Sequence, residues 1–432
     1  MKSEMKKILS NTVWMTFDKV FMLLLNLIVT FKVANYFGSF DYGNYQYAVS
    51  IVAIFEILIA FVDGRVVKKR YINVDPDILV YNATICRVIF SIIACFAGGI
   101  YILITNRNIE FSIMFFILLI NAVFVNLRFG MANRFEYLLK SKKIVIAADS
   151  AALIASGLQL LAVSFKLSII SIAVIQLISS LINMIILVLQ YNVEFKERKK
   201  NIFDLELVGG LIKESVPLAI ASSCATIYTR CDSVMIGSLM TIAEVGVYSI
   251  SAKLISVVQI ALIPIRESFY PRLIQLYSTD KKKYASEYIK ISSILTWTYI
   301  VGVLISFVIL PTAFKYLNEE YTQSYPIYRI YVLGTFFMYN AGLRAGHFTL
   351  INRGSVLTYT QIFSGILNVI LNYILISSIG LSGAAIATVI TQACSLLGSN
   401  LMFGEEGREV FVWQLKALNP LYAFMGILRL KR

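Results

Sequence analysis

Long, uninterrupted apolar runs constrain this chain more than any other feature of its sequence. Each run is long enough to cross the hydrocarbon core of a bilayer as an α-helix, which takes about 20 residues. The runs lie at roughly 11–37, 44–63, 79–105, 109–133, 144–166, 168–190, 211–237, 242–265, 288–312, 325–347, 356–378 and 381–403. The sequence therefore predicts an all-α integral membrane protein with twelve transmembrane helices.

The composition excludes most other classes of protein. Of the 432 residues, 58% are apolar and 15% charged, against about 45–50% and about 25% in soluble domains. A transmembrane β-barrel alternates polar and apolar residues, whereas these runs are unbroken. The net charge of +14 does not indicate nucleic-acid binding, because its cations lie in short clusters between apolar runs rather than on a basic soluble domain.

The basic clusters alternate along the chain. The N-terminus, the C-terminal tail and every even-numbered connection carry several Lys or Arg residues, among them Arg128 and Arg134 in the fourth connection and Arg344 in the tenth. The odd-numbered connections are nearly bare. Because positive loops stay in the cytoplasm, both termini and all even-numbered connections are predicted to be cytoplasmic. We expect a multi-pass protein of the cytoplasmic (inner) cell membrane.

The residues suited to metal or redox chemistry are few. The five cysteines lie inside apolar runs without metal-type spacing, so we expect no disulfide, no metal and no cofactor. The single histidine, His347, is predicted to be a polar residue near a helix end. The basic segment 404–432 contains Trp413 among apolar residues and is predicted either to lie as an amphipathic helix on the cytoplasmic surface or to fray.

Two short motifs recur at equivalent places in the two halves of the chain. The pattern [DE]-x-G-x-Y opens the second span at 41–45 and the eighth at 244–248, and LS-x-x-x-IA opens the sixth at 167–173 and the twelfth at 381–387. Halves with an even number of spans both start on the cytoplasmic side, which predicts a parallel repeat about an axis along the membrane normal. The predicted parts are a six-helix bundle at 1–192, a cytoplasmic linker at 193–210, a second six-helix bundle at 211–403 and a tail at 404–432.

Several longer stretches resemble a known transporter family. They are YFGSFDYGNYQYAVSI at 36–51, YTRCDSVMIGSL at 228–239, EVGVYSISAKL at 244–254, PIRESFYPRL at 264–273 and IGLSGAAIATVITQ at 379–392. The chain resembles the Wzx-type polysaccharide repeat-unit flippases, which serve O-antigen and capsule synthesis in the multidrug/oligosaccharidyl-lipid/polysaccharide exporter superfamily. Lipid II flippases look like fourteen-span relatives, and no extra pair of spans is found here.

The resemblance implies a specific architecture and cargo. It implies two bundles around a central cavity lined mainly by spans 1, 2, 7 and 8. It also implies carriage of a polyprenyl-diphosphate-linked oligosaccharide from the inner to the outer leaflet by alternating access. We expect the protein to act as a monomer in the lipid bilayer, with H⁺ or Na⁺ as a candidate coupling ion.

Six cations fall inside the predicted spans and are the candidates for holding the diphosphate: Lys19, Lys32, Arg87, Arg230, Lys253 and Arg329. A charge at membrane depth costs a few kcal/mol or more unless it faces a cavity or a partner. Lys253 lies near the middle of its span, where a long side chain reaches the surface least. The alternative for cations nearer the span ends is snorkelling to the interface.

Polar stripes accompany two of these cations. Ser249, Lys253 and Ser256 lie on one helical face, and Ser222, Thr226, Thr229 and Ser233 form a similar stripe beside Arg230. Such faces are typical of a wet cavity. The alternative is that the hydroxyls bond to carbonyls of their own helix.

The acids within the spans are fewer: Asp18, Glu56, Asp149 and Asp232. Four acids against six bases leave the membrane interior cationic, as a diphosphate cargo requires. Asp18, Glu56 and Asp232 lie on cavity-lining spans and are candidates for coupling transport to an ion gradient. The alternative is static ion pairing with the cations.

Functions of other classes fit the sequence less well. A membrane enzyme needs a catalytic loop or domain outside the bilayer, and the longest connection has neither a Gly-rich phosphate motif nor paired acids with a base. A multidrug and toxin extrusion-type cation antiporter shares the implied fold but needs an acidic or aromatic cavity. Nothing in the sequence is typical of a channel's selectivity filter.

Overall fold

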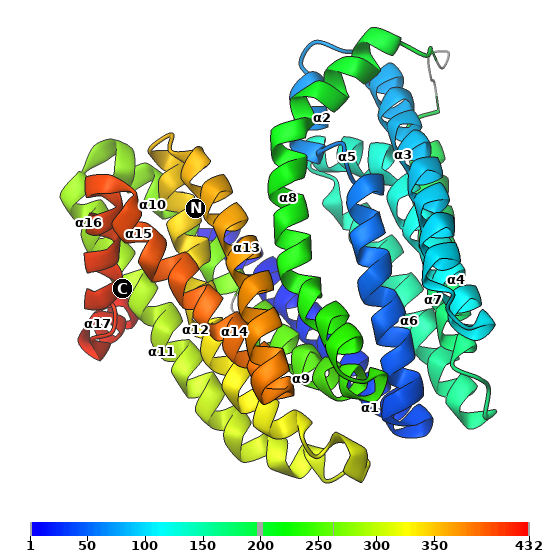
Figure 1. Cartoon of the computed structure of the whole chain (residues 1–432). Helices are drawn as coiled ribbons and strands as arrows, with labels where there is room; N and C mark the ends of the chain where they lie inside the picture. The colour runs from blue at the N-terminus through cyan, green and yellow to red at the C-terminus, as the bar shows by residue number, and fades with distance from the viewer. Residues whose placement is uncertain (1, 197–201, 262, 431–432) are drawn as a thin grey trace. The chain divides into compact units, whose positions relative to one another are not determined.

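The computed structural model describes residues 2–196, 202–261 and 263–430, and the regular elements of these residues are all helical (Figure 1). Side chains are described for residues 21–196, 202–256, 258, 269 and 272–426. The α-helices are α1 (Lys2–Ile59), α2 (Gly64–Arg70), α3 (Pro76–Thr105), α4 (Ile109–Leu127), α5 (Phe129–Tyr137), α6 (Ser141–Ser164), α7 (Ile170–Glu194), α8 (Leu205–Leu239), α9 (Ile242–Ala261), α10 (Ile263–Thr279), α11 (Lys281–Phe314), α12 (Ser324–Leu350), α13 (Gly354–Ile379), α14 (Leu381–Ala393), α15 (Ser399–Met402), α16 (Gly404–Lys416) and α17 (Pro420–Leu430). A 3₁₀ turn, η1 (Glu319–Tyr321), and a π-helical turn, η2 (Cys394–Gly398), complete the set.

Each predicted span coincides with helix in the structure. Among the described residues, nine helical segments are long and apolar enough to cross a membrane, and one of them, Phe21–Arg70, holds the second predicted span and the part of the first from residue 21 onward. The helices α9 and α12 lie at predicted spans but are not among the nine. The prediction of an all-helical, multi-pass membrane protein is confirmed, while the number twelve and the orientation of the termini stay predictions.

The first two predicted spans are separated by a single glycine. Gly38 has φ 73° and ψ 175°, and it interrupts α1 between two helical stretches. A positive φ in this region is strained for any residue with a Cβ, so glycine is required for the chain to turn here. The echoed motif 41–45 follows directly, with Tyr42 and Tyr45 buried.

The second copy of that motif also opens a helix after a break. Glu244 accepts hydrogen bonds from the backbone N–H and hydroxyl of Thr241, and the Glu244 N–H faces the Thr241 hydroxyl at 3.4 Å. This reciprocal arrangement is a capping box, which starts α9. Tyr248 is buried as Tyr45 is, so the two copies share a buried tyrosine at the last motif position and a preceding helix break.

The chain forms two compact units, Ile28–Gly237 and Ser238–Arg432 with Met1–Leu27. We refer to them as the N-terminal and C-terminal units. Helix α8 contributes most of its length to the N-terminal unit, whereas the predicted second half starts at residue 211. The boundary between the compact units depends on packing contacts, whereas the predicted halves depend on a proposed duplication. The predicted division into halves therefore stays a prediction.

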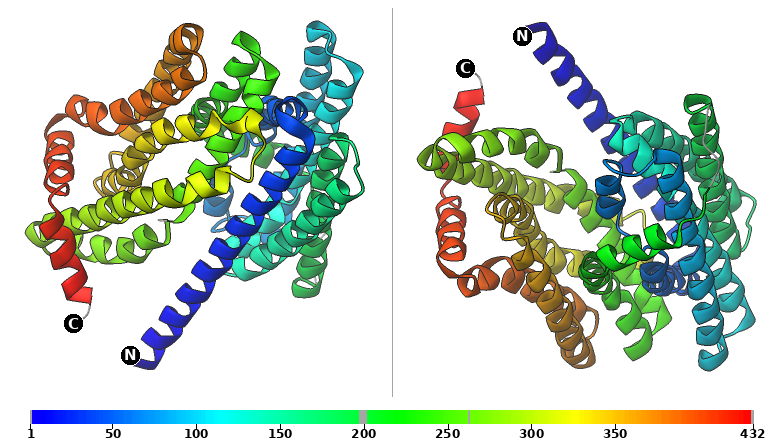
Figure 2. Two further views of the ribbon diagram at one scale, coloured as in Figure 1. Left: turned by 90° about the horizontal axis from the view of Figure 1, so that it is seen from below. Right: turned by 90° about the horizontal axis from the view of Figure 1, so that it is seen from above.

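In the N-terminal unit, α3, α4, α6 and α7 lie side by side as a bundle (Figures 1 and 2). Helix α3 shows how its two faces differ. Its inward face carries small residues such as Ser91, Ala94 and Gly98, while Phe96 and Leu103 are largely exposed. Small residues allow close helix packing, and an apolar outer surface suits contact with lipid.

In the C-terminal unit, α12 packs against α9, α11 and α14, and α13 packs against α14 (Figure 2). The predicted tail is helical rather than frayed, since α16 and α17 both pack on α11. Trp413 is only 7% exposed and lies among the rings of Tyr284, Tyr288 and His347. Its indole therefore packs against protein rather than against the lipid surface that the sequence indicated.

His347 lies in the last turn of α12, as predicted, but it is buried. Its Nδ1 is 2.8 Å from the Tyr284 hydroxyl. The contact joins α12 to α11, and both rings also lie against Trp413 of α16.

The turn between α13 and α14 depends on glycine at position 383. A Cβ there would lie 2.1 Å from the carbonyl oxygen of Leu375 and 2.3 Å from its carbon. Since backbone cannot yield as a side chain can, we expect Gly383→Ala to lower the free energy of unfolding by about 1–3 kcal/mol. Thermal unfolding in detergent measures this, with Gly157→Ala, which meets nothing within 4 Å, as the matched control. Equal stability of the two variants would contradict the prediction.

Candidate functional site

Arg87 is the most enclosed of the predicted site cations that the structure describes. It projects from α3, is 4% exposed, and donates hydrogen bonds to the carbonyl oxygens of Ile59 and Val62, both at 2.7 Å. Its guanidinium also lies over the Phe129 ring, 3.7 Å from the centroid. These contacts cap the end of α1, which makes the position of Arg87 a structural one in this unit.

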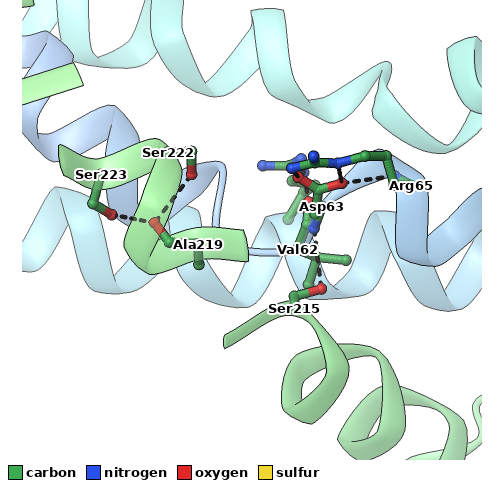
Figure 3. A network of polar contacts seen from close by, with 8 residues as sticks. Val62, Asp63, Arg65, Ser215, Ala219, Ser222 and Ser223 are labelled. Carbon is green, nitrogen blue, oxygen red and sulfur yellow. Dashed lines mark hydrogen bonds and ion pairs between the residues drawn. The ribbon is translucent and has the colours of Figure 1, made fainter. Parts of the chain in front are cut away.

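The segment that Arg87 holds is also tied to α8 (Figure 3). The Asp63 carboxylate accepts from the backbone and side chain of Arg65, and the Asp63 N–H donates to the Ser215 hydroxyl at 3.1 Å. An ion pair between Arg70 and Glu214 adds a second link from α2 to α8. One turn of α8, at Glu214 and Ser215, is thereby linked to the end of α1 and to α2 within the N-terminal unit.

The predicted cations Lys32 and Arg230 have a different environment. Both side chains are exposed, and among the described residues neither makes a hydrogen bond or an ion pair. They lie on α1 and α8, the helices predicted to line the cavity. Asp232, two residues from Arg230 on α8, is buried at 4% exposure, with its carboxylate 3.7 Å from the sulfur of Cys231.

The remaining predicted residues divide between the units. Glu56 accepts a hydrogen bond from Asn126 at 2.8 Å in the N-terminal unit. In the C-terminal unit, Lys253 is half-buried with contacts of its own, and Arg329 is exposed beside the rings of Phe307 and Tyr325. The side chains of Asp18 and Lys19 lie outside the described residues.

Several hydroxyl groups of the two polar stripes donate hydrogen bonds to carbonyl oxygens of their own helices. Ser222 donates to the Ala219 carbonyl and Thr229 to that of Thr226 (Figure 3 shows the first of these). Ser249 and Ser256 bond likewise to carbonyls of α9. These contacts match the alternative interpretation of the stripes, and the hydroxyls need no cargo or water to satisfy them.

Sequence reasoning places one arginine wrongly. The sequence assigns Arg344 to a cytoplasmic connection, yet it lies within α12 and is 3% exposed. It donates to the Ser395 carbonyl at 3.0 Å and to the Ser399 hydroxyl at 2.7 Å, where the π-helical turn interrupts regular bonding. Its place inside the apolar run that forms α12, before the last turn of that helix, is the signal that could have identified it.

Comparison with known proteins gives a family and a fold. The family described as polysaccharide biosynthesis protein matches residues 8–277. Lipid II flippase MurJ in an inward closed conformation is 14% identical, with 96% of each chain covered and a TM-score of 0.69. A multidrug resistance MATE family transporter of the MOP superfamily, inward-facing, is 14% identical, with 95% of each chain covered and a TM-score of 0.68.

A further MATE multidrug transporter, DinF-BH, is 16% identical over 94% of this chain and 96% of its own, with a TM-score of 0.61. None of the curated proteins matches the sequence. The fold is therefore the one shared by MATE transporters and MurJ. At these identities it does not distinguish between their cargoes.

The capping contacts of Arg87 generate a test of its role. Arg87→Lys keeps the charge but cannot reach both carbonyls, and each hydrogen bond to a charged group is worth about 1.5–3 kcal/mol. We expect thermal unfolding to show a loss of about that size. The control is Arg230→Lys, an exposed position that should leave stability unchanged. Unaltered stability with impaired transport in Arg87→Lys would instead place Arg87 at the cargo.

Proposed function

Because the chain belongs to the polysaccharide biosynthesis protein family, we propose that it flips a polyprenyl-diphosphate-linked oligosaccharide from the inner to the outer leaflet of the cytoplasmic membrane. Its family and fold are those of a membrane transporter and not of an enzyme. The proposal adds the cargo, its direction and a mechanism of alternating access between the two six-helix halves.

The observation that carries the proposal is the pair of exposed cations Lys32 and Arg230. Both lie on helices that are long and apolar enough to cross a membrane, and neither has a partner among the described residues. Since an isolated charge facing lipid is costly, we assign both to a wet cavity. With Lys253 they would supply the positive charge that a diphosphate needs.

The second candidate is export of organic cations, as the printed names of the MATE relatives suggest for those proteins. Exposed cations on cavity-lining helices would repel such a cargo, whereas they attract a diphosphate. We therefore favour the anionic cargo. The neighbouring Asp232 and the bonded Glu56 serve in this scheme as coupling groups rather than as cargo ligands.

Removal of the proposed cargo-binding cations should slow flipping. A charge-assisted hydrogen bond contributes about 1.5–3 kcal/mol, so Arg230→Ala and Lys253→Ala should each weaken cargo affinity about tenfold or more. Lys253→Arg should keep partial activity, because a point charge suffices there, and Arg230→Lys should lose more because the planar fork is gone. The assay follows labelled lipid-linked oligosaccharide becoming accessible outside reconstituted vesicles, with Lys166→Ala as the control. Full activity of both alanine variants at equal protein level would exclude this site.

Ion coupling should depend on the acids of the cavity-lining spans. We expect at least one of Asp18→Asn, Glu56→Gln and Asp232→Asn to flip cargo at a rate that no longer responds to an imposed proton or sodium gradient. The measurement compares flipping in vesicles with and without each gradient. Wild-type gradient dependence in all three variants would place coupling elsewhere.

A further inference from the structure

A pocket of about 410 Å³ lies within the N-terminal unit, and none of its lining residues is among those assigned to cargo binding or coupling. It is lined by the segment from Asp63 to Lys68, the end of α4, helix α5 and the start of α6. The side chain of Arg65 is 66% exposed and that of Lys68 is 39% exposed, so the pocket opens at the surface. All of these segments belong to connections or helix ends that the sequence predicts to be cytoplasmic.

The charged residues that line the pocket are three cations and two acids, so one cation has no acidic partner. Asp63 binds Arg65 through both carboxylate oxygens, at 2.8 and 2.9 Å. Glu136 pairs with Lys68 at 3.0 Å. Arg128, the third cation of the lining, forms no ion pair with any described residue. The surplus positive charge of the pocket therefore resides on Arg128.

The guanidinium of Arg128 is held in place without being neutralised. Its Nε donates to the Val125 carbonyl at 3.1 Å and its Nη1 to the Asn183 side-chain oxygen at 3.0 Å. Among the described residues, Nη2 makes no hydrogen bond. Two neutral oxygen atoms thus hold the guanidinium in place, and its second terminal nitrogen is left to donate to a ligand.

We propose that this pocket binds a phosphate group, with Arg128 as the principal ligand and Lys68 as the second. A partly buried guanidinium positioned by neutral groups matches the geometry of a phosphate oxyanion. The volume exceeds what one phosphate needs, so the group can be carried by a larger molecule. Two sources present this chemistry at a membrane surface: the headgroup of an anionic phospholipid and a soluble phosphate.

The proposal does not depend on the identity of the transported cargo. Arg128, Lys68 and Glu136 are not among the residues assigned to cargo binding or coupling. Loss of phosphate binding with intact flipping would leave the proposed function standing, and the reverse result would leave the pocket standing.

The first experiment measures binding of radiolabelled orthophosphate to the purified full-length protein by equilibrium dialysis. Arg128→Gln should weaken binding about tenfold or more, because the charge-assisted hydrogen bonds are lost. Glu136→Gln should tighten phosphate binding several-fold, because the substitution releases Lys68 and removes a negative charge.

The Glu136→Gln variant should fold, because Glu136 is exposed and its ion pair contributes little to stability. Lys142→Gln removes an exposed cation of the same unit outside the pocket and should bind as wild type.

The second experiment distinguishes the two sources. Thermal unfolding is compared in nanodiscs of phosphatidylcholine alone and with added phosphatidylglycerol, for the wild type, Arg128→Gln and Glu136→Gln. Stabilisation by phosphatidylglycerol that Arg128→Gln loses and Glu136→Gln increases would identify a lipid headgroup. Orthophosphate binding with the same pattern of variants would identify a soluble phosphate.

Three results would overturn the proposal. One is the absence of any effect from both probes on the wild type. Another is equal binding by wild type and folded Arg128→Gln. The third is that Glu136→Gln binds neither phosphate probe more tightly than the wild type does. This result would overturn the proposal even if Arg128→Gln does not fold.

Discussion

A membrane helix satisfies its backbone polar groups internally, and the requirement becomes difficult only where such a helix ends or breaks. The end of α1 meets this difficulty at Ile59 and Val62, and the interruption of α14 meets it at Ser395. In both places a buried arginine from another helix supplies the missing donors. Removing the Arg87 guanidinium would take this donor from two carbonyl oxygens, and a buried carbonyl left without a partner costs more than the bond itself is worth. The Ser395 carbonyl is less dependent on its arginine, because it also accepts from the Ser399 hydroxyl.

Arg128, at the end of α4, and Arg344, near the end of α12, lie at equivalent places in the two halves of the proposed duplication. Arg128 reaches Asn183 of α7, and Arg344 reaches Ser395 and Ser399 in the run that continues α14. In the predicted scheme these are the fourth and sixth spans of each half. The two guanidinium groups are bonded differently: both terminal nitrogens of Arg344 donate, whereas Arg128 donates through Nε and Nη1 and its Nη2 has no bond to any described residue. Both terminal nitrogens of Arg344 are thus used in contacts within the C-terminal unit, whereas Arg128 in the N-terminal unit has one terminal nitrogen left for the proposed phosphate.

The approximate positions of the predicted spans could be read from the sequence because a long apolar run is a local feature of the chain. The tail helices and the burial of Trp413 could not, since they depend on the packing of α16 and α17 against α11. Arg87 illustrates the same limit for the site. Its burial in a span was foreseeable, but its partners, Ile59 and Val62, lie more than twenty residues away across another helix.

The six predicted cations therefore do not form one class, and their partners separate them. Both terminal nitrogens of Arg87 donate to carbonyl oxygens, and Arg329 has aromatic rings beside it. Within the described part of the chain Lys32 and Arg230 have neither, although a charge in a span needs some compensation. In the proposed function, compensation that the described residues do not supply comes from water and from the diphosphate cargo. An uncompensated cation is thus a better guide to the cargo than the number of cations in the spans.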